Sequence, residues 1–161
     1  MSNLAKQLKK LDVSKLKMKN GSTVEKELKR HASILADCIM EALDDVYNSY
    51  TPIVYQRSYG LYNSLYIDNR LKINISSEGA SLSIGLHFDE GAIHESFSGE
   101  DASTAILLNE GWQTHGSFSD IPYLGYREGT HFIEKGIEKY KLSVGNPFVV
   151  KLTIIDEERI F

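Results

Sequence analysis

Histidines and carboxylates are the side chains of this sequence that could bind a metal ion or move protons. None of the five histidines forms an i, i+4 pair on an expected helix or belongs to a Cys/His cluster, the arrangements typical of zinc sites. They are His31, His87, His94, His115 and His131. His87, His94 and Glu95 could meet in space across one expected loop, but chance explains that spacing better than a metal site does. We therefore expect no metal ion and no other cofactor, and we expect His31, beside Arg30, on a solvated helix face.

The residue sets used in nucleophilic and acid–base catalysis are missing from the sequence. There is no G-x-S-x-G motif, and no Walker A or G-x-G-x-x-G phosphate cradle. The single cysteine, Cys38, falls among apolar helix positions, which indicates a buried, inert thiol. Neighbouring acids such as Asp44 and Asp45 point apart on a helix, whereas a catalytic acid–base pair must converge in a cleft. The sequence predicts no catalytic residue and a protein that is not an enzyme.

Aromatic residues stand out more than catalytic ones. Six tyrosines fall within twenty positions: Tyr47, Tyr50, Tyr55, Tyr59, Tyr62 and Tyr66. Tyrosine and arginine are enriched where proteins meet, although these rings could equally cover the base of a sheet. Residue type and expected exposure give a set of candidate interface residues: Tyr55, Arg57, Tyr59, Tyr62, Trp112, His115, Phe118, Tyr123, Tyr126 and Arg127.

Length and composition favour one soluble domain. The chain has 161 residues, of which 42% are apolar and 25% charged, values typical of globular proteins. No apolar run reaches the roughly 18 to 20 residues of a membrane span. No signal for secretion is indicated, and one cysteine suits a reducing cytoplasm.

Charge is distributed unevenly along the chain. The net charge is −4, yet residues 1–30 hold nine of the eighteen Lys and Arg and only three acids. We divide the chain into a basic arm, residues 1–21, and a single α+β domain, residues 22–161. The arm could meet an acidic partner protein, a neighbouring copy or nucleic acid, or it could be a frayed, solvated terminus.

Hydrophobic periodicity predicts the elements of that domain. A capping box, Ser22-Thr23-Val24-Glu25, starts a long amphipathic helix that Pro52 ends. Alternation predicts a hairpin from residues 71–75 and 82–88, joined by Ser77-Glu78-Gly79. Residues 89–101 are expected as a loop, residues 102–109 as a short helix capped by Asp101, and residues 111–126 as a long loop.

The last third of the chain predicts one more helix and one more strand. Residues 132–140 keep helical spacing before the stop Gly145-Asn146-Pro147, and residues 148–154 alternate as a strand. The predicted fold class is α+β: the long N-terminal helix and a shorter C-terminal helix pack on a small antiparallel β-sheet.

Three stretches resemble one family of proteins. They are residues 50–65 between the long helix and the first strand, Asn109-Glu110-Gly111-Trp112, and Gly129-Thr130-His131-Phe132-Ile133 followed by a helix. Together they resemble the neck proteins of tailed bacteriophages, the minor structural proteins of head-tail joining and tail completion. The resemblance covers nearly the whole chain. Tyr59-Gly60 replaces the family's frequent threonine-glycine pair, and the loop at residues 113–126 is longer than expected.

The resemblance implies a virion structural protein without catalytic activity. Such a protein assembles in the host cytoplasm as a homo-oligomeric ring, expected to be a hexamer, and joins the tail tube to the head connector. Its partners are neighbouring tail and connector proteins. DNA passes nearby without specific binding, and no membrane is involved. An acidic lumen would let DNA slide, because it would repel phosphates.

Two other classes of function stay open. One is a small phage-encoded or cytoplasmic binding protein that inhibits or regulates a host factor through its acidic surface. The other, which the sequence supports least, is a hydrolase built from the scattered histidines and acids.

Overall fold

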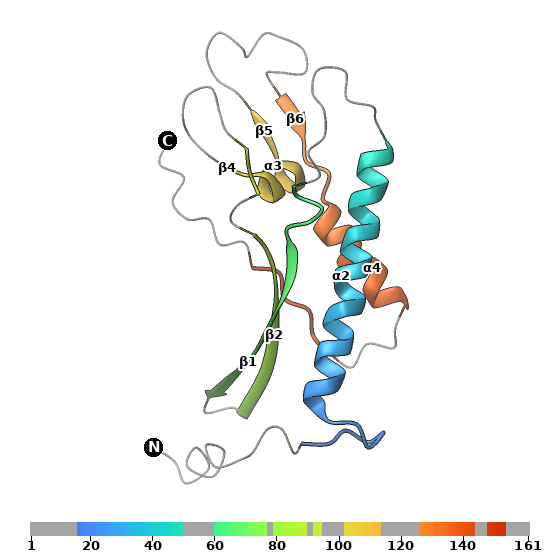
Figure 1. The fold of residues 1–161 in the computed structure, drawn as a ribbon, viewed down its shortest axis with the longest axis vertical. Coiled ribbons are helices and arrows are strands. Elements are labelled where there is room, and N and C mark those ends of the chain that lie inside the picture. The colour runs from blue at the N-terminus through green and yellow to red at the C-terminus, as the bar shows by residue number, and fades with distance from the viewer. Residues whose placement is uncertain are drawn as a thin grey trace.

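The computed structural model describes residues 16–49, 60–76, 79–89, 92–94, 102–113, 126–143 and 148–153. These residues contain three helices, α2 (Val24–Asn48), α3 (Thr104–Glu110) and α4 (Phe132–Ser143). They also contain three antiparallel strand pairs: β1 (Leu65–Ser76) with β2 (Gly79–Phe88), β3 (Ile93–His94) with β4 (Ala102–Ser103), and β5 (Gly111–Gln113) with β6 (Tyr126–Glu128). The predicted α+β class is confirmed, with the long helix packed on the C-terminal helix (Figure 1).

Helix α2 begins one residue later than the predicted capping box implies. Its N-cap is Thr23, whose hydroxyl accepts a hydrogen bond from the backbone N–H of Lys26 at 3.3 Å. The preceding chain explains the shift, because Val24 N–H donates to the carbonyl of Leu16 and holds Thr23 in an extended conformation before the helix. The prediction of Ser22 as the cap was therefore wrong. Pro52 lies outside the described residues.

The buried stripe of α2 matches the predicted spacing. Its buried apolar residues include Leu28, Ala32, Ile39, Leu43 and Val46. Helix α2 packs mainly against α4, which adds the fully buried Phe132 and the nearly fully buried Tyr140.

A glycine lets the two helices approach closely. A Cβ atom at Gly136 of α4 would lie 2.6 Å from the Cα of Ile39 on α2. The backbones therefore touch at this point, and any side chain at residue 136 would force them apart.

The β1–β2 hairpin is confirmed and is longer than predicted. Its register runs from Leu65 opposite Phe88 to Ser76 opposite Gly79, with an irregularity between Asp68 and Lys72. Near its open end, Leu65, Leu86 and Phe88 pack against the core, and the Phe88 ring lies 5.9 Å from that of Phe132. In Figure 1 the hairpin runs alongside α2, with its closed end toward the start of that helix.

Three other predictions need correction. Residues 102 and 103 form strand β4, because Thr104 N–H donates to the carbonyl of Ala92 and draws this segment against β3, so the helix starts at Thr104. Ser103, not Asp101, is the N-cap, and Asp101 lies outside the described residues. The ends of the expected loop 111–126 are strands β5 and β6; residues 114–125 lie outside the described part of the chain.

The predicted last strand is absent from residues 148–153, and Ile154 lies outside the described residues. Here the ring of Phe148 meets the imidazole of His31 edge-on, with the ring centroids 5.0 Å apart.

His31 itself contradicts the expectation of a solvated face. It is 4% exposed, and its Nδ1 lies 2.7 Å from the hydroxyl of Tyr140. The sequence around it is charged, but α4 covers this turn of α2. Cys38 is buried as predicted, and burial raises the pKa of its thiol.

Among the helices of the described residues, none combines the length and apolar character needed to cross a membrane.

Candidate functional site

The short β5–β6 hairpin brings together three of the predicted interface residues. Trp112 pairs with Arg127, and Gln113 pairs with Tyr126. The Arg127 guanidinium carbon lies 5.2 Å from the centroid of the Trp112 ring, a cation–π contact that holds both side chains on one face. Tyr126 is 64% exposed. We call Trp112, Tyr126 and Arg127 the aromatic hairpin.

Two glycines attach the aromatic hairpin tightly to α3. Gly111 has a φ of +82°, and a Cβ there would collide with the carbonyl of Arg127. A Cβ at Gly129 would collide with the carbonyl of Asn109. Glycine is needed at both positions because the two backbones touch, and the first position also needs a left-handed conformation. The hairpin is therefore held rigidly on the end of α3.

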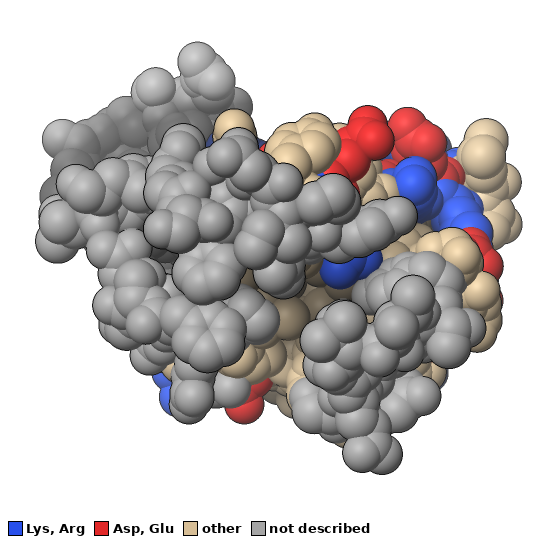
Figure 2. All heavy atoms as spheres, turned by 90° about the horizontal axis from the view of Figure 1, so that it is seen from above, with Lys and Arg blue, Asp and Glu red and all other residues tan. Residues whose placement is uncertain are grey.

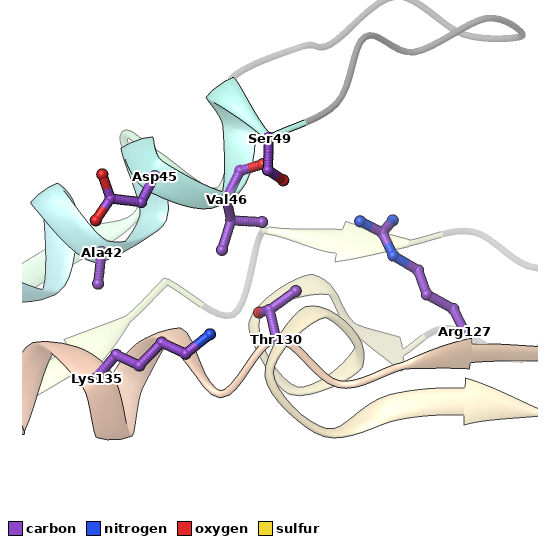
Figure 3. Close-up of a pocket in the computed structure, with 7 residues that line it drawn as sticks. All are labelled: Ala42, Asp45, Val46, Ser49, Arg127, Thr130 and Lys135. Carbon is purple, nitrogen blue, oxygen red and sulfur yellow. The ribbon is translucent and has the colours of Figure 1, made fainter.

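A pocket of about 240 Å³ lies beside Arg127, at the end of α2 (Figure 3). It is lined by Ala42, Asp45, Val46, Ser49, Arg127, Thr130 and Lys135. Figure 3 shows Val46 and Thr130 facing each other across the pocket, with Arg127 at one end and Lys135 at the other. Asp45 forms an ion pair at 2.9 Å with Lys139, which is not a lining residue. The lining therefore contributes two cations, Arg127 and Lys135, and one acid whose charge is already neutralised. Such a lining suits a small acidic or polar side chain of a partner.

Tyr62, another candidate interface residue, belongs to the core and not to the aromatic hairpin. Tyr62 and Tyr47 pack against the core cluster, as expected for rings that cover the base of the fold. Tyr66 is 52% exposed and its ring lies 5.6 Å from that of His87. The other candidate interface residues lie outside the described residues: Tyr55, Arg57, Tyr59, His115, Phe118 and Tyr123.

A polar cluster that the sequence prediction missed joins the end of α3 to the start of α4. One ligand atom each from Glu110, His131 and Glu134 lies within 4.8 Å of the other two. This is the one group of at least three metal-ligand side chains that the described residues bring together. The H-x-x-E spacing of His131 and Glu134 was the available signal, but Glu110 is 21 positions away from His131 in the sequence. The predicted spacing of His87, His94 and Glu95 is untested, because the side chains of the last two lie outside the described part.

Figure 2 shows the molecule from the end that carries the aromatic hairpin. In the described part of this face, Lys and Arg lie next to Asp and Glu, so charges of both signs alternate there.

Comparison of the chain with protein-family models, with curated proteins and with solved structures finds no match.

Proposed function

We propose that this chain is a structural subunit of a tailed-bacteriophage virion, acting in tail completion or head-tail joining as part of a ring. The observation that carries the proposal is the long, two-stranded β1–β2 sheet. Among the described residues, neither β1 nor β2 pairs with a third strand. Two-stranded hairpins are marginally stable in water, and a strand edge left open is a template for pairing with another chain.

The outer half of the same hairpin carries an exposed apolar side chain. Ile73, near the closed end, is 49% exposed, although its partner across the strands is Leu82. By contrast, Leu65 and Leu86 at the open end pack against the core. A neighbouring subunit that covered Ile73 would bury this apolar surface and pair an open edge at once.

A ring subunit needs two different surfaces that fit each other, because a closed ring is built from head-to-tail contacts. The chain offers two candidates at opposite ends: the closed end of β1–β2 and the aromatic hairpin (Figure 1). Trp, Tyr and Arg are the residue types that contribute most to binding at protein interfaces. On the described part of the face in Figure 2, Lys and Arg lie among Asp and Glu, and such mixed charges favour contact with a protein surface over a phosphate backbone.

The test is the solution mass of the purified chain, measured by light scattering over a range of concentrations, with electron microscopy of the particles. We expect rings, with a hexamer as the expected size, or a monomer that assembles on purified tails or connectors. Ile73→Asp should shift the assembly to higher concentration by at least about tenfold, since it places a charge where an apolar contact forms. Asn74→Asp, one residue along the same strand and exposed, is the matched control.

A chain that stays monomeric at every concentration and ignores tails and connectors would contradict the proposal. Tight capture of a soluble host protein by that monomer would favour the inhibitor class instead.

A further inference from the structure

We propose that Glu110, His131 and Glu134 form a binding site for a divalent transition-metal ion, Zn²⁺ above all. The three residues come from two helices: Glu110 ends α3, His131 precedes α4, and Glu134 lies in the first turn of α4. One imidazole and two carboxylates are a common donor set for such ions. This site is independent of the assembly surfaces proposed above.

The buried side chain of Asn109 organises the site. Its Nδ2 donates to Glu110 Oε1 at 2.7 Å and to Glu134 Oε1 at 3.2 Å. Its Oδ1 accepts a hydrogen bond from Ile133 N–H at 3.0 Å, which caps α4. Asn109 is 1% exposed, so its amide is held by packing as well as by these bonds. One rigid amide thus fixes two carboxylates from different helices side by side.

The histidine is fixed through its backbone. Its N–H donates to the carbonyl of Asn109, and its carbonyl accepts from Lys135 N–H, both at 3.0 Å. Its φ of +50° turns the side chain out of the helix direction. Because these two bonds define the backbone on both sides, the imidazole starts from a set position beside the carboxylates.

One atom of the cluster is not explained by its protein contacts. Oε2 of Glu134 is buried and has no hydrogen-bond partner. An acid in the first turn of a helix is favourable in itself, and the Asn109 bond explains why Oε1 faces inward. Neither accounts for a second carboxylate oxygen taken out of water without a donor, an arrangement that destabilises the folded chain, most of all for a charged group. A cation bound between the two carboxylates would remove this cost.

The separations fit an ion after a small adjustment. For three atoms no more than 4.8 Å apart, the best-placed ion lies within about 2.8 Å of each. Zinc needs roughly 2.0–2.2 Å to nitrogen and oxygen, so each side chain must move inward by less than about 1 Å. Glu110 and His131 are exposed, so the side of the site away from Asn109 is open to solvent. A fourth position is therefore accessible to water or to a side chain of another molecule.

The imidazole of His131 favours a transition-metal ion over Mg²⁺ or Ca²⁺. Mg²⁺ and Ca²⁺ prefer oxygen ligands and larger or more hydrated sites, whereas nitrogen donors favour Zn²⁺ and its neighbours in the first transition series.

The test uses the full chain, freed of any affinity tag and of metal, with Zn²⁺ as the probe. Bound zinc is counted by elemental analysis after gel filtration, and affinity is measured by calorimetry. We expect one ion per chain that millimolar Mg²⁺ does not displace, and a rise in Tm of about 5–10 °C when zinc exceeds Kd a hundredfold. Bound Co²⁺ should show the intense visible absorption of a four-coordinate ion.

Each of the three proposed ligands is replaced in turn, and similar residues outside the site serve as controls. Glu110→Gln, Glu134→Gln and His131→Asn should each weaken zinc binding by at least about tenfold, asparagine being chosen because it tolerates the positive φ. Glu138→Gln, an exposed acid of the same helix, and His87→Asn should bind zinc like the unchanged chain.

Glu110→Gln keeps the test decisive if another variant fails to fold, because Glu110 is exposed at the end of its helix. Circular dichroism without metal checks folding in every case. Failure of the unchanged chain to retain zinc, displacement by Mg²⁺, or equal affinity in Glu110→Gln would overturn the proposal.

Discussion

Helix α4 meets the rest of the molecule in two chemically opposite ways. Along its length it packs against α2 through apolar contacts, so closely that only a hydrogen fits at Gly136. At its first turn it meets the end of α3 through a polar junction, in which Asn109, Glu110 and Glu134 are joined by hydrogen bonds. The two regions are neighbours, since Phe132 of the apolar contact lies between His131 and Glu134 in the sequence.

The difference shows how one helix can serve both stability and binding. The apolar contact gains free energy from each buried carbon, and the buried polar atoms of His31 and Tyr140 within it hydrogen-bond to each other. The polar junction carries two acids and leaves one carboxylate oxygen buried without a partner. The polar junction is therefore held in place by the apolar contact next to it. Its side chains are available to bind a ligand, which the apolar contact cannot do. Mutations in the two regions should therefore differ in how they change stability and zinc binding.

The largest expected loss of stability comes from the apolar contact. Leu43 is fully buried in the cluster formed by α2, α3 and α4. Leu43→Ala removes its transfer free energy and leaves a cavity, so the free energy of unfolding should fall by about 2–5 kcal/mol. Leu142→Ala is the same change at a residue that is 89% exposed, and it should stay within about 0.5 kcal/mol. Urea unfolding measures both; equal losses would contradict this description of the core.

A smaller loss, with a different signature, is expected at the polar junction. Asn109→Ala removes the cap of α4 and the two bonds that orient the carboxylates, and should cost about 1–3 kcal/mol. Unlike Leu43→Ala, it should also weaken zinc binding by about 10–100-fold, because the ligands lose their support. Asn74→Ala, on the exposed surface of β1, is the control for both measurements. Loss of stability with unchanged zinc affinity would show that Asn109 only caps the helix.

The same division explains what could be predicted from the sequence. The stripe of α2 and the alternation of β1 and β2 are local patterns, and both were found. The ends of elements were missed where a distant contact decides them: Leu16 shifts the cap of α2 to Thr23, and Ala92 draws residues 102 and 103 into a strand.

The candidate site was predictable only in part. Trp112, Tyr126 and Arg127 were found by residue type, but only the pairing of β5 with β6 places them together. The metal-ligand cluster was missed because its members are separated in the sequence and are joined by the backbone bonds of Thr130 and His131 to the end of α3. His31 was misplaced for a related reason: its sequence neighbours are charged, and the ring that buries it, Tyr140, lies 109 positions away.

His31 gives the smallest predicted effect, a dependence of stability on pH. The direction of this effect follows from the surroundings of the ring. Arg30 can only donate, so Nε2 of His31 accepts at 3.0 Å, and the proton of the neutral ring must sit on Nδ1, which donates to Tyr140. Burial first, and the Arg30 charge second, lower the pKa of His31 below its ordinary 6.5, with Glu27 opposing them. The folded chain then binds fewer protons than the unfolded chain just below pH 6.5. Stability should fall as the pH drops through this range, by at most about 1.4 kcal/mol per unit.

Replacement of the ring by a neutral amide separates this effect from the titration of other groups. His31→Gln should flatten the dependence of stability on pH between about pH 5.5 and 7.5, because glutamine can hydrogen-bond without taking up a proton. His87→Gln, at a histidine on the β1–β2 hairpin, should keep the slope of the unchanged chain. Urea unfolding at a series of pH values measures both. If the slope survives in His31→Gln, His31 takes up its proton equally well in the folded and unfolded chains, and the buried, neutral ring described here is wrong.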